Sequence, residues 1–384
     1  MDINMARVAR SALVAAAMAQ AATAAGVIEM PITFRNSYAM VSVETGTPGE
    51  EHFLLYDTGS ASTWIADKQC AQGGCQNISG FPRVGYNLSA SSTGEQISPT
   101  ATVDYLGGNI AGPGVRDTFR VGDTTWNQTF LNIANSSMAN VPGDGFLGLA
   151  FDTISDGDTH TVPETLLGAG VLAEPRFGLY VGTELNDTHG RPGAGTLTLG
   201  GSHEDKYIDG DVTPSRAATR PILGTYAGGD GKPVTGGRNW EGQFKASGVF
   251  DTGAGKISVP SLDVYLIYQS IGWDWGAILS GDHIPACSEF NASWSVTFSF
   301  AGEAEGEYRD VVLTGDQLAR PGFANREDAC WPPFEPGNDD GFFLFGTTLL
   351  DQFYTVWDFG GSKPEEYKPR IGFGQLKKEY KPRY

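Results

Sequence analysis

Two short segments of this sequence contain residues that could perform acid–base chemistry. Asp57 begins the run Asp-Thr-Gly-Ser, and Asp251 begins the run Asp-Thr-Gly-Ala. Each aspartate follows a largely apolar run, at residues 53–56 and 248–250, that is typical of a buried strand. The glycine two residues after each aspartate permits a tight turn that brings backbone amides close to the carboxylate. The pattern therefore predicts two carboxylates held rigidly at the ends of strands.

The two segments share a second feature further along the chain. Gly148 ends an apolar run 91 residues after Asp57, and Gly346 ends another 95 residues after Asp251. One Asp-Thr-Gly arises easily by chance, but two with matched apolar partners indicate an internal repeat. We therefore expect a duplicated β lobe whose two copies face each other across a cleft.

If the two copies pack about a twofold axis, Asp57 and Asp251 would meet at that axis. Two carboxyl groups about 3 Å apart cannot both ionise, so one proton is shared between them. The ionised member can take a proton from water, while the protonated member donates to an amide carbonyl oxygen. The sequence therefore predicts peptide-bond hydrolysis by Asp57 and Asp251 that needs no metal ion and no other cofactor.

The composition agrees with a large, turn-rich β protein. The chain has 384 residues, 52 of them glycine, and only 18% of its residues are charged. This length favours two domains, and this balance disfavours coiled coils and disordered tails. The formal charge of −19 would repel phosphate backbones, and no basic patch offsets it, so nucleic acid is not an expected partner.

The amino end has the features of a secretory signal peptide over residues 1–25. Arg7 and Arg10 precede an apolar, alanine-rich run that allows cleavage near residues 22–24. No later run reaches the roughly 18 apolar residues that a membrane span needs, so we expect no membrane association. The protein is expected to be a secreted monomer, with the vacuole as an alternative location. N-glycosylation sequons suit such a chain and begin at Asn77, Asn87, Asn127, Asn135, Asn186 and Asn291.

Four cysteines allow three pairings, and an exported chain would oxidise them. Pairing Cys70 with Cys75 and Cys287 with Cys330 makes the least topological demand. A zinc site would need four ligands close together, in a spacing that these cysteines lack. Two disulfides are therefore expected.

The paired Asp-Thr-Gly motifs resemble those of the pepsin-like aspartic endopeptidases, in particular the secreted members of fungal type. The resemblance covers about residues 36–374, beginning with YAMVSVETGTP at 38–48 and ending with YTVWD at 354–358 and IGF at 371–373. It implies a mostly β, bilobal pepsin-like acid protease fold, with two pseudo-twofold-related lobes and a central cleft. It also implies polypeptide substrates with bulky hydrophobic residues around the cleaved bond.

This resemblance divides the chain into four parts. Residues 1–25 form the signal peptide, 26–200 the amino-terminal β lobe with Asp57, 201–374 the carboxy-terminal β lobe with Asp251, and 375–384 a polar, solvated tail. The cysteine pairs 70–75 and 287–330 fall where the family has a small-loop disulfide and a disulfide in its carboxy-terminal lobe.

The resemblance also implies roles for residues around the aspartates. Thr58 and Thr252 resemble buried threonines that bind across to the opposite lobe, and Tyr105 resembles the tyrosine of a flap hairpin within residues 103–112. Trp64 resembles the tryptophan whose indole N–H supports that tyrosine, and a simple core position is the alternative. The Ser60 hydroxyl is expected to donate to Asp57. The support residues expected around the two aspartates are Thr58, Gly59, Ser60, Thr252 and Gly253.

Two short segments depart from the family pattern. The family usually follows the flap tyrosine with Gly-Thr-Gly, whereas Leu-Gly-Gly follows here, which predicts a hairpin tip of different shape. Ala254 and Gly255 stand where the family commonly has a hydroxyl residue and a serine. Loss of a hydroxyl bond of about 1.5–3 kcal/mol would raise the upper pKa of the aspartate pair by about one unit, extending activity to higher pH.

The segment between the predicted cleavage point and Tyr38 has only about a dozen residues. That is too short for the basic inhibitory prosegment that the family's zymogens usually carry. Residues 27–32 are instead predicted to form a first strand.

The remaining patterns give further predictions. One helix is expected from Pro260 to Gly272, and a hairpin turn at residues 228–231. The five histidines are scattered and read as surface residues: His52, His160, His189, His203 and His283. The alternative function is that of a catalytically weak or inactive secreted binding or inhibitor protein, because fold alone does not establish activity.

Overall fold

The computed structural model describes residues 25–183, 192–216, 223–227, 247–302, 304, 307–337 and 342–383. Four sequence predictions lie outside these ranges. They are the signal peptide except for its last residue, the sequon at Asn186, the surface position of His189 and the turn at 228–231.

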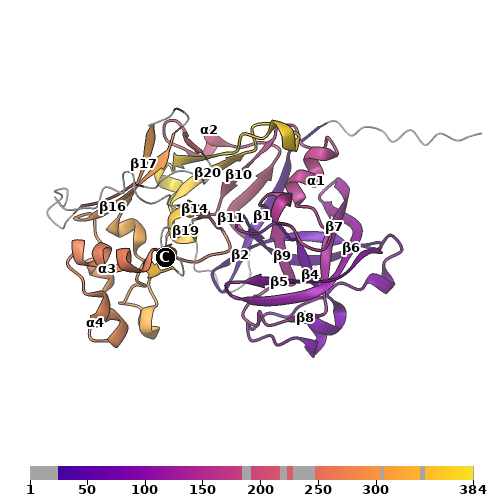
Figure 1. Cartoon of the computed structure of the whole chain (residues 1–384), viewed down its shortest axis with the longest axis horizontal. Helices are drawn as coiled ribbons and strands as arrows, with labels where there is room; N and C mark the ends of the chain where they lie inside the picture. The colour runs from indigo at the N-terminus through magenta and orange to yellow at the C-terminus, as the bar shows by residue number, and fades with distance from the viewer. Residues whose placement is uncertain are drawn as a thin grey trace, which may run out of the picture.

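The molecule is mostly β and has two lobes, as the resemblance implied (Figure 1). The purple lobe holds β1 (Ile28–Arg35), β2 (Tyr38–Thr45), β3 (Glu50–Asp57), β4 (Trp64–Ala66), β5 (Glu95–Tyr105), β6 (Gly108–Val121), β7 (Thr124–Ile133), β8 (Asn135–Ser136), β9 (Gly145–Gly148) and helix α1 (Val162–Gly168). The orange lobe holds β13 (Leu223–Ala227), β14 (Ser247–Phe250), β15 (Ile257–Val259), α3 (Ser261–Ser270), α4 (Trp275–Ser280), β16 (Ser295–Ala301), β17 (Tyr308–Thr314), β18 (Phe334–Pro336), β19 (Phe342–Phe345) and α5 (Thr347–Leu350).

A set of elements from the middle and the carboxy end of the chain joins the two lobes. These elements are β10 (Arg176–Tyr180), β11 (Pro192–Leu199), α2 (Glu204–Tyr207), β12 (Thr213–Arg216), β20 (Phe353–Asp358) and β21 (Arg370–Gln375). They continue the large sheet of the purple lobe in the order β12-β21-β20-β10-β11-β1-β2-β3-β9-β4-β7-β6-β5. Trp357 on β20 packs against the hydrophobic cores of both lobes. The orange lobe, whose described strands form two separate sheets, packs its core against β20 and β21 of this large sheet.

The predicted internal repeat is present in the strand pairing. In the purple lobe β3 runs parallel to β9, with Asp57 opposite Gly148, and β4 pairs antiparallel to β9. In the orange lobe β14 runs parallel to β19, with Phe250 opposite Phe345, and β15 pairs antiparallel to β19. Each aspartate thus reaches its position because an apolar strand pairs in parallel with the apolar-glycine run downstream.

Two smaller predictions about the elements are confirmed. The first strand, β1, pairs with both β2 and β11. The helix α3 starts directly after Pro260 and is followed by Gly272 at φ +83°, a conformation that glycine adopts easily. Its buried face carries Val264, Ile267 and Tyr268, whereas Tyr265 is 51% exposed.

The two expected disulfides are formed. Cys70 is bonded to Cys75, and Cys287 to Cys330. Within the described ranges no cluster of histidine, cysteine and acidic side chains could hold a metal ion. Within the same ranges no helix is both long and apolar enough to cross a bilayer.

The carboxy-terminal segment differs from the solvated tail that was expected. Leu376 is only 3% exposed, and the Tyr380 ring packs on the ring of Tyr207 at 5.0 Å. The hydroxyl of Tyr180 donates to the Tyr380 carbonyl at 3.1 Å, and the Arg383 amide donates to Thr183 at 2.7 Å. The two apolar side chains, spaced four residues apart, dock this otherwise polar segment on β10 and α2.

Candidate active site

The two aspartates predicted from the sequence lie at equivalent strand ends. Asp57 is the last residue of β3, and Asp251 directly follows β14. The Gly59 amide donates to Asp57 Oδ1 at 2.9 Å, and the Gly253 amide donates to Asp251 Oδ1 at 2.7 Å. Each carboxylate is therefore oriented by the glycine turn of its own motif.

The same two glycines show that the carboxyl groups face each other. A Cβ atom placed on Gly59 would lie 2.4 Å from the carboxyl carbon of Asp251, and one on Gly253 would lie 2.8 Å from Asp57 Oδ1. Real Cβ atoms essentially never approach so closely, so each motif needs glycine to let the opposite carboxyl group approach. The fold thus brings together two acidic residues that are 194 positions apart in the sequence.

The threonines between these residues join the two strand ends. Each hydroxyl accepts a hydrogen bond from the backbone amide of the other threonine, at 3.0 Å in both directions. Each hydroxyl also donates to a backbone carbonyl of the opposite motif: Thr58 to Phe250 at 2.9 Å, and Thr252 to Tyr56 at 2.9 Å. Both side chains are buried. These four bonds fix the separation of the two aspartates.

The environments of the two aspartates are unequal. The Ser60 hydroxyl donates to Asp57 Oδ2 at 2.5 Å, whereas Asp251 has only the amides of Gly253 and Ala254 as donors on its own turn. Burial raises the pKa of Asp251 well above its usual value, and the neighbouring Asp57 carboxylate raises it further. Burial and the Ser60 bond to Asp57 thus both favour the shared proton on Asp251.

A hairpin covers this site at the place expected for the flap. Strands β5 and β6 pair up to Tyr105 opposite Gly108, so that Leu106 and Gly107 form a two-residue turn. Gly108 has φ +144°, which a side chain would disfavour, and Leu106 at the tip is 81% exposed. The hairpin is confirmed, and its glycine-rich tip is short.

Aromatic packing holds this hairpin next to its turn. The Tyr105 ring meets the Phe146 ring edge to face at 5.4 Å, and Phe146 stacks on Trp64 at 4.9 Å. Burial raises the pKa of Tyr105, and the charge of Asp57 adds to this, while nearby Ser60 and Trp64 partly oppose it. Neither the Tyr105 hydroxyl nor the Trp64 indole N–H makes a well-formed hydrogen bond within the described residues. Trp64 supports Tyr105 here through packing.

A cavity of about 580 Å³ lies between the aspartates and the hairpin. Its walls come from the hairpin tip, the segment 137–141 and the strands that carry the two motifs. The apolar lining residues include Leu55, Leu106, Met138, Val141, Phe146, Val249, Phe342 and Leu344. A peptide bond placed against Asp57 and Asp251 would therefore have apolar surface on both sides.

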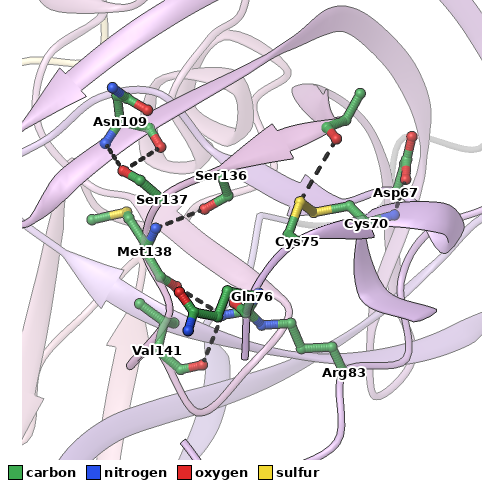
Figure 2. Close-up of a disulfide and its surroundings, with 11 residues drawn as sticks. Asp67, Cys70, Cys75, Gln76, Arg83, Asn109, Ser136, Ser137, Met138 and Val141 are labelled. Carbon is green, nitrogen blue, oxygen red and sulfur yellow. Dashed lines mark hydrogen bonds between the residues drawn. A yellow bond between two sulfur atoms is a disulfide. The ribbon is translucent and has the colours of Figure 1, made fainter. Parts of the chain in front are cut away.

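Arg83 holds one wall of this cavity, and the sequence analysis did not identify it (Figure 2). Its guanidinium is buried and donates to the carbonyls of Met138 at 2.8 Å and Val141 at 3.3 Å. On the other side of the segment, Ser137 exchanges hydrogen bonds with Asn109 of β6, at 2.8 and 2.9 Å. Arg83 binds backbone carbonyls, which leave no pattern in the sequence.

One histidine prediction was wrong. His52 is fully buried on β3, with Nδ1 at 3.6 Å from Asp144 Oδ2. The other oxygen of Asp144 accepts the amides of Val84 at 2.6 Å and Gly85 at 2.8 Å. β3 is an inner strand between β2 and β9, and the consecutive buried residues 54–57 show that both of its faces are covered. The other described histidines, His160, His203 and His283, are partly or largely exposed.

Asp144 is an ionisable group that the fold has buried. Burial alone would raise the pKa of Asp144. The contact with His52 and the hydrogen bonds from the two backbone amides lower the pKa by more than burial raises it, so the pKa lies below its usual value. Asp144 directly precedes β9 and binds the backbone next to Arg83. Its charge therefore supports the same region that forms the cavity wall.

Comparison with known proteins agrees with this geometry. Residues 37–366 match the family model described as eukaryotic aspartyl protease. Gastricsin from Cavia porcellus is 24% identical over 90% of this chain and 82% of its own length. Mucorpepsin from Rhizomucor pusillus is 28% identical over 88% of this chain and 79% of its own length. The vacuolar aspartic protease of Candida albicans is 27% identical over 87% of this chain and 76% of its own length. The chain therefore belongs to the eukaryotic aspartyl protease family and is a peptidase of the aspartic type.

Proposed function

We propose that this chain is a secreted endopeptidase in which Asp57 and Asp251 activate a water molecule between them. The proposal rests on one observation: the glycine turn of each motif lies against the carboxyl group of the other motif. The reciprocal hydrogen bonds between Thr58 and Thr252 hold the two motifs in this position. Two carboxyl groups so placed share a proton, which supplies an acid and a base at one point.

The inequality of the two aspartates assigns their roles in this proposal. Asp251 holds the proton and donates it to the carbonyl oxygen of the substrate. Asp57, bound by Gly59 and Ser60, takes a proton from water as the water oxygen attacks the carbonyl carbon. The tetrahedral intermediate then collapses and the C–N bond breaks. The leaving nitrogen receives the proton that Asp57 took from water, and a hydroxyl of the intermediate returns a proton to Asp251. Thr252 and Gly253 position Asp251 as Thr58 and Gly59 position Asp57.

The hairpin that carries Tyr105 acts as the flap in this proposal. Leu106, Gly107 and Tyr105 line the cavity, so the hairpin would close over a bound peptide and exclude bulk water. Trp64 supports this movement by packing under Phe146, which contacts Tyr105. The apolar walls favour bulky hydrophobic side chains on either side of the cleaved bond.

The proposed location rests on the amino-terminal sequence pattern and on the two disulfides. Five of the six sequon asparagines lie within the described residues and are exposed, which suits glycosylation: Asn77, Asn87, Asn127, Asn135 and Asn291. The vacuole is the alternative location, since one of the relatives bears a vacuolar name. The proposed enzyme is a monomer that acts on polypeptides.

Cleavage of acid-denatured globin, with and without a statine-type inhibitor of aspartic peptidases, tests this proposal. We expect fragments that disappear when the inhibitor is present. Folded protein that binds globin without cleaving it would instead support the inactive binding or inhibitor protein. The absence of a hydroxyl at Ala254 is the feature that keeps this second function open.

A further inference from the structure

A second cavity, of about 460 Å³, adjoins the proposed substrate cavity. Tyr38 lines both of them. Ala254 lines the first, and the next two residues, Gly255 and Lys256, line the second. A Cβ atom on Gly255 would meet no atom within 4 Å, so the backbone here faces open space. The turn after Asp251 therefore lies at the boundary between the two cavities.

Hydrogen bonds and an ion pair hold the wall at this boundary. The Gly255 carbonyl accepts hydrogen bonds from Arg320 Nη1 at 3.1 Å and from the Thr348 hydroxyl at 2.8 Å. Arg320 also binds Asp351 through an ion pair of 3.1 Å whose side chains are only 19% and 8% exposed. Because these groups are tied to each other, the cavity keeps its shape without a ligand.

Trp331 gives this cavity its chemical character. It is 43% exposed, an unusual degree for the largest apolar side chain, and Pro332 and Pro333 beside it also line the cavity. Phe323 meets the indole edge to face at 5.2 Å and fixes its orientation. A fixed and partly exposed indole can stack with another aromatic ring.

The charges around the cavity are already paired. Lys256 lies 3.3 Å from Glu335, and Arg320 is bound to Asp351. The Lys256 ammonium also lies over the Trp331 ring, 5.6 Å from its centroid. An acidic or basic occupant would have to compete with one of the ion pairs, whereas an uncharged ring would meet only this longer ammonium–indole contact. The cavity is therefore suited to a neutral aromatic side chain.

We propose that this second cavity binds an aromatic side chain of the substrate polypeptide, several residues away from the cleaved bond, by stacking on Trp331. The proposal rests on the proposed function, because the occupant reaches Trp331 as part of a chain bound at Asp57 and Asp251. An extended peptide advances about 3.3 Å per residue, so a substrate that leaves the first cavity past Ala254 passes over Gly255 and Lys256.

Peptides of graded length test this inference. A short peptide that the parent protein cleaves is extended with alanines on its amino or carboxy side, and phenylalanine then replaces one alanine at a time. We expect phenylalanine at one remote position, on one side only, to raise kcat/KM roughly two- to tenfold. The variants are Trp331→Ala, Trp331→Phe and, as an exposed aromatic that lines neither cavity, Tyr265→Ala.

The expected result is specific to Trp331. Trp331→Ala should lose the preference for the remote phenylalanine, Trp331→Phe should keep part of it, and Tyr265→Ala should keep all of it. Cleavage of the short peptide should be unchanged in all three.

Two results would overturn this inference and leave the proposed function standing. In the first, the short peptide is cleaved, but either the parent shows no preference for a remote phenylalanine or Trp331→Ala keeps that preference unchanged. The other is a changed oligomeric state of Trp331→Ala without any change in peptide preference, which would assign the cavity to contact between two copies. Failure of the parent to cleave any peptide would contradict the proposed function itself.

Discussion

The hydroxyl oxygen of Thr58 lies 3.0 Å from the amide nitrogen of Thr252, and the reverse distance is also 3.0 Å. These bonds join two parts of the chain that are almost 200 residues apart, at the points where both aspartates leave their strands. The same hydrogen bonds therefore join the two motifs and position the two carboxyl groups.

The first prediction concerns this exchange. Thr58→Val removes one hydroxyl and leaves the buried amide of Thr252 without its acceptor, which costs about 1–3 kcal/mol of the free energy of unfolding. Urea unfolding followed by tryptophan fluorescence measures the loss. Thr125→Val, at an exposed position on β7, is the matched control and should change stability little. Equal stability of the two variants would contradict the role given to the exchange.

The second prediction concerns the missing hydroxyl near Asp251. A threonine at position 254 can donate to the ionised carboxylate, which lowers the pKa of Asp251. Since Asp251 must be protonated to act, activity disappears as the pH rises through that pKa. In Ala254→Thr the alkaline limb of the pH–rate profile should therefore move down by about one unit. Ala254→Val has the same shape without the hydroxyl and should leave the limb in place. An unmoved limb in Ala254→Thr, or an equal movement in both variants, would refute this explanation.

The third prediction concerns pH-dependent stability at Asp144. The pKa of Asp144 is lowered in the folded state, so its carboxylate contributes stability above the unfolded pKa of about 4, and this is lost as the pH falls through the folded value. Asp144→Asn should lose about 1–3 kcal/mol of unfolding free energy near neutral pH, and its stability should then fall less steeply with acid. Unfolding curves over a pH series show both effects. The control is Asp123→Asn, in the exposed turn before β7, whose unfolding free energy should vary with pH as that of the parent does. If the unfolding free energy of Asp144→Asn fell with acid as steeply as that of the parent, this explanation would be wrong.

The fourth prediction concerns the cavity wall held by Arg83. Without its guanidinium, the carbonyls of Met138 and Val141 lose their donor and the segment 137–141 loosens. We expect Arg83→Ala to raise KM several-fold for peptides with bulky residues at the cleaved bond, with a smaller change in kcat. Arg83→Lys, which keeps the charge, should recover part of the loss. Arg120→Ala, at an exposed ion pair with Glu44, is the control. If Arg83→Ala left KM unchanged, Arg83 would have no role in positioning the cavity wall.

The sequence alone could reveal the centre of the site. The Asp-Thr-Gly motifs, their apolar partners and the four cysteines are local patterns, and the structure pairs all of them as expected. They could be predicted because a strand that ends in a glycine turn leaves the same short pattern wherever it occurs.

The surroundings of the site could not be predicted in the same way. His52 was mistaken for a surface residue because its burial depends on distant parts of the chain, here the segment that carries Asp144. Arg83 binds carbonyls of a loop, and Trp331 lines a cavity formed by five separate segments. The tail from residue 375 is polar in composition, yet Leu376 and Tyr380 dock it. Each of these features depends on contacts between remote parts of the chain.

The most direct test of the account is the turnover of Asp57→Asn and Asp251→Asn, each purified as a folded protein and assayed separately on the same peptide. Because the acid and the base are different members of one pair, either change should lower kcat by at least about a hundredfold. If either folded variant kept a kcat within a few-fold of the parent, the two aspartates would not share the work of hydrolysis.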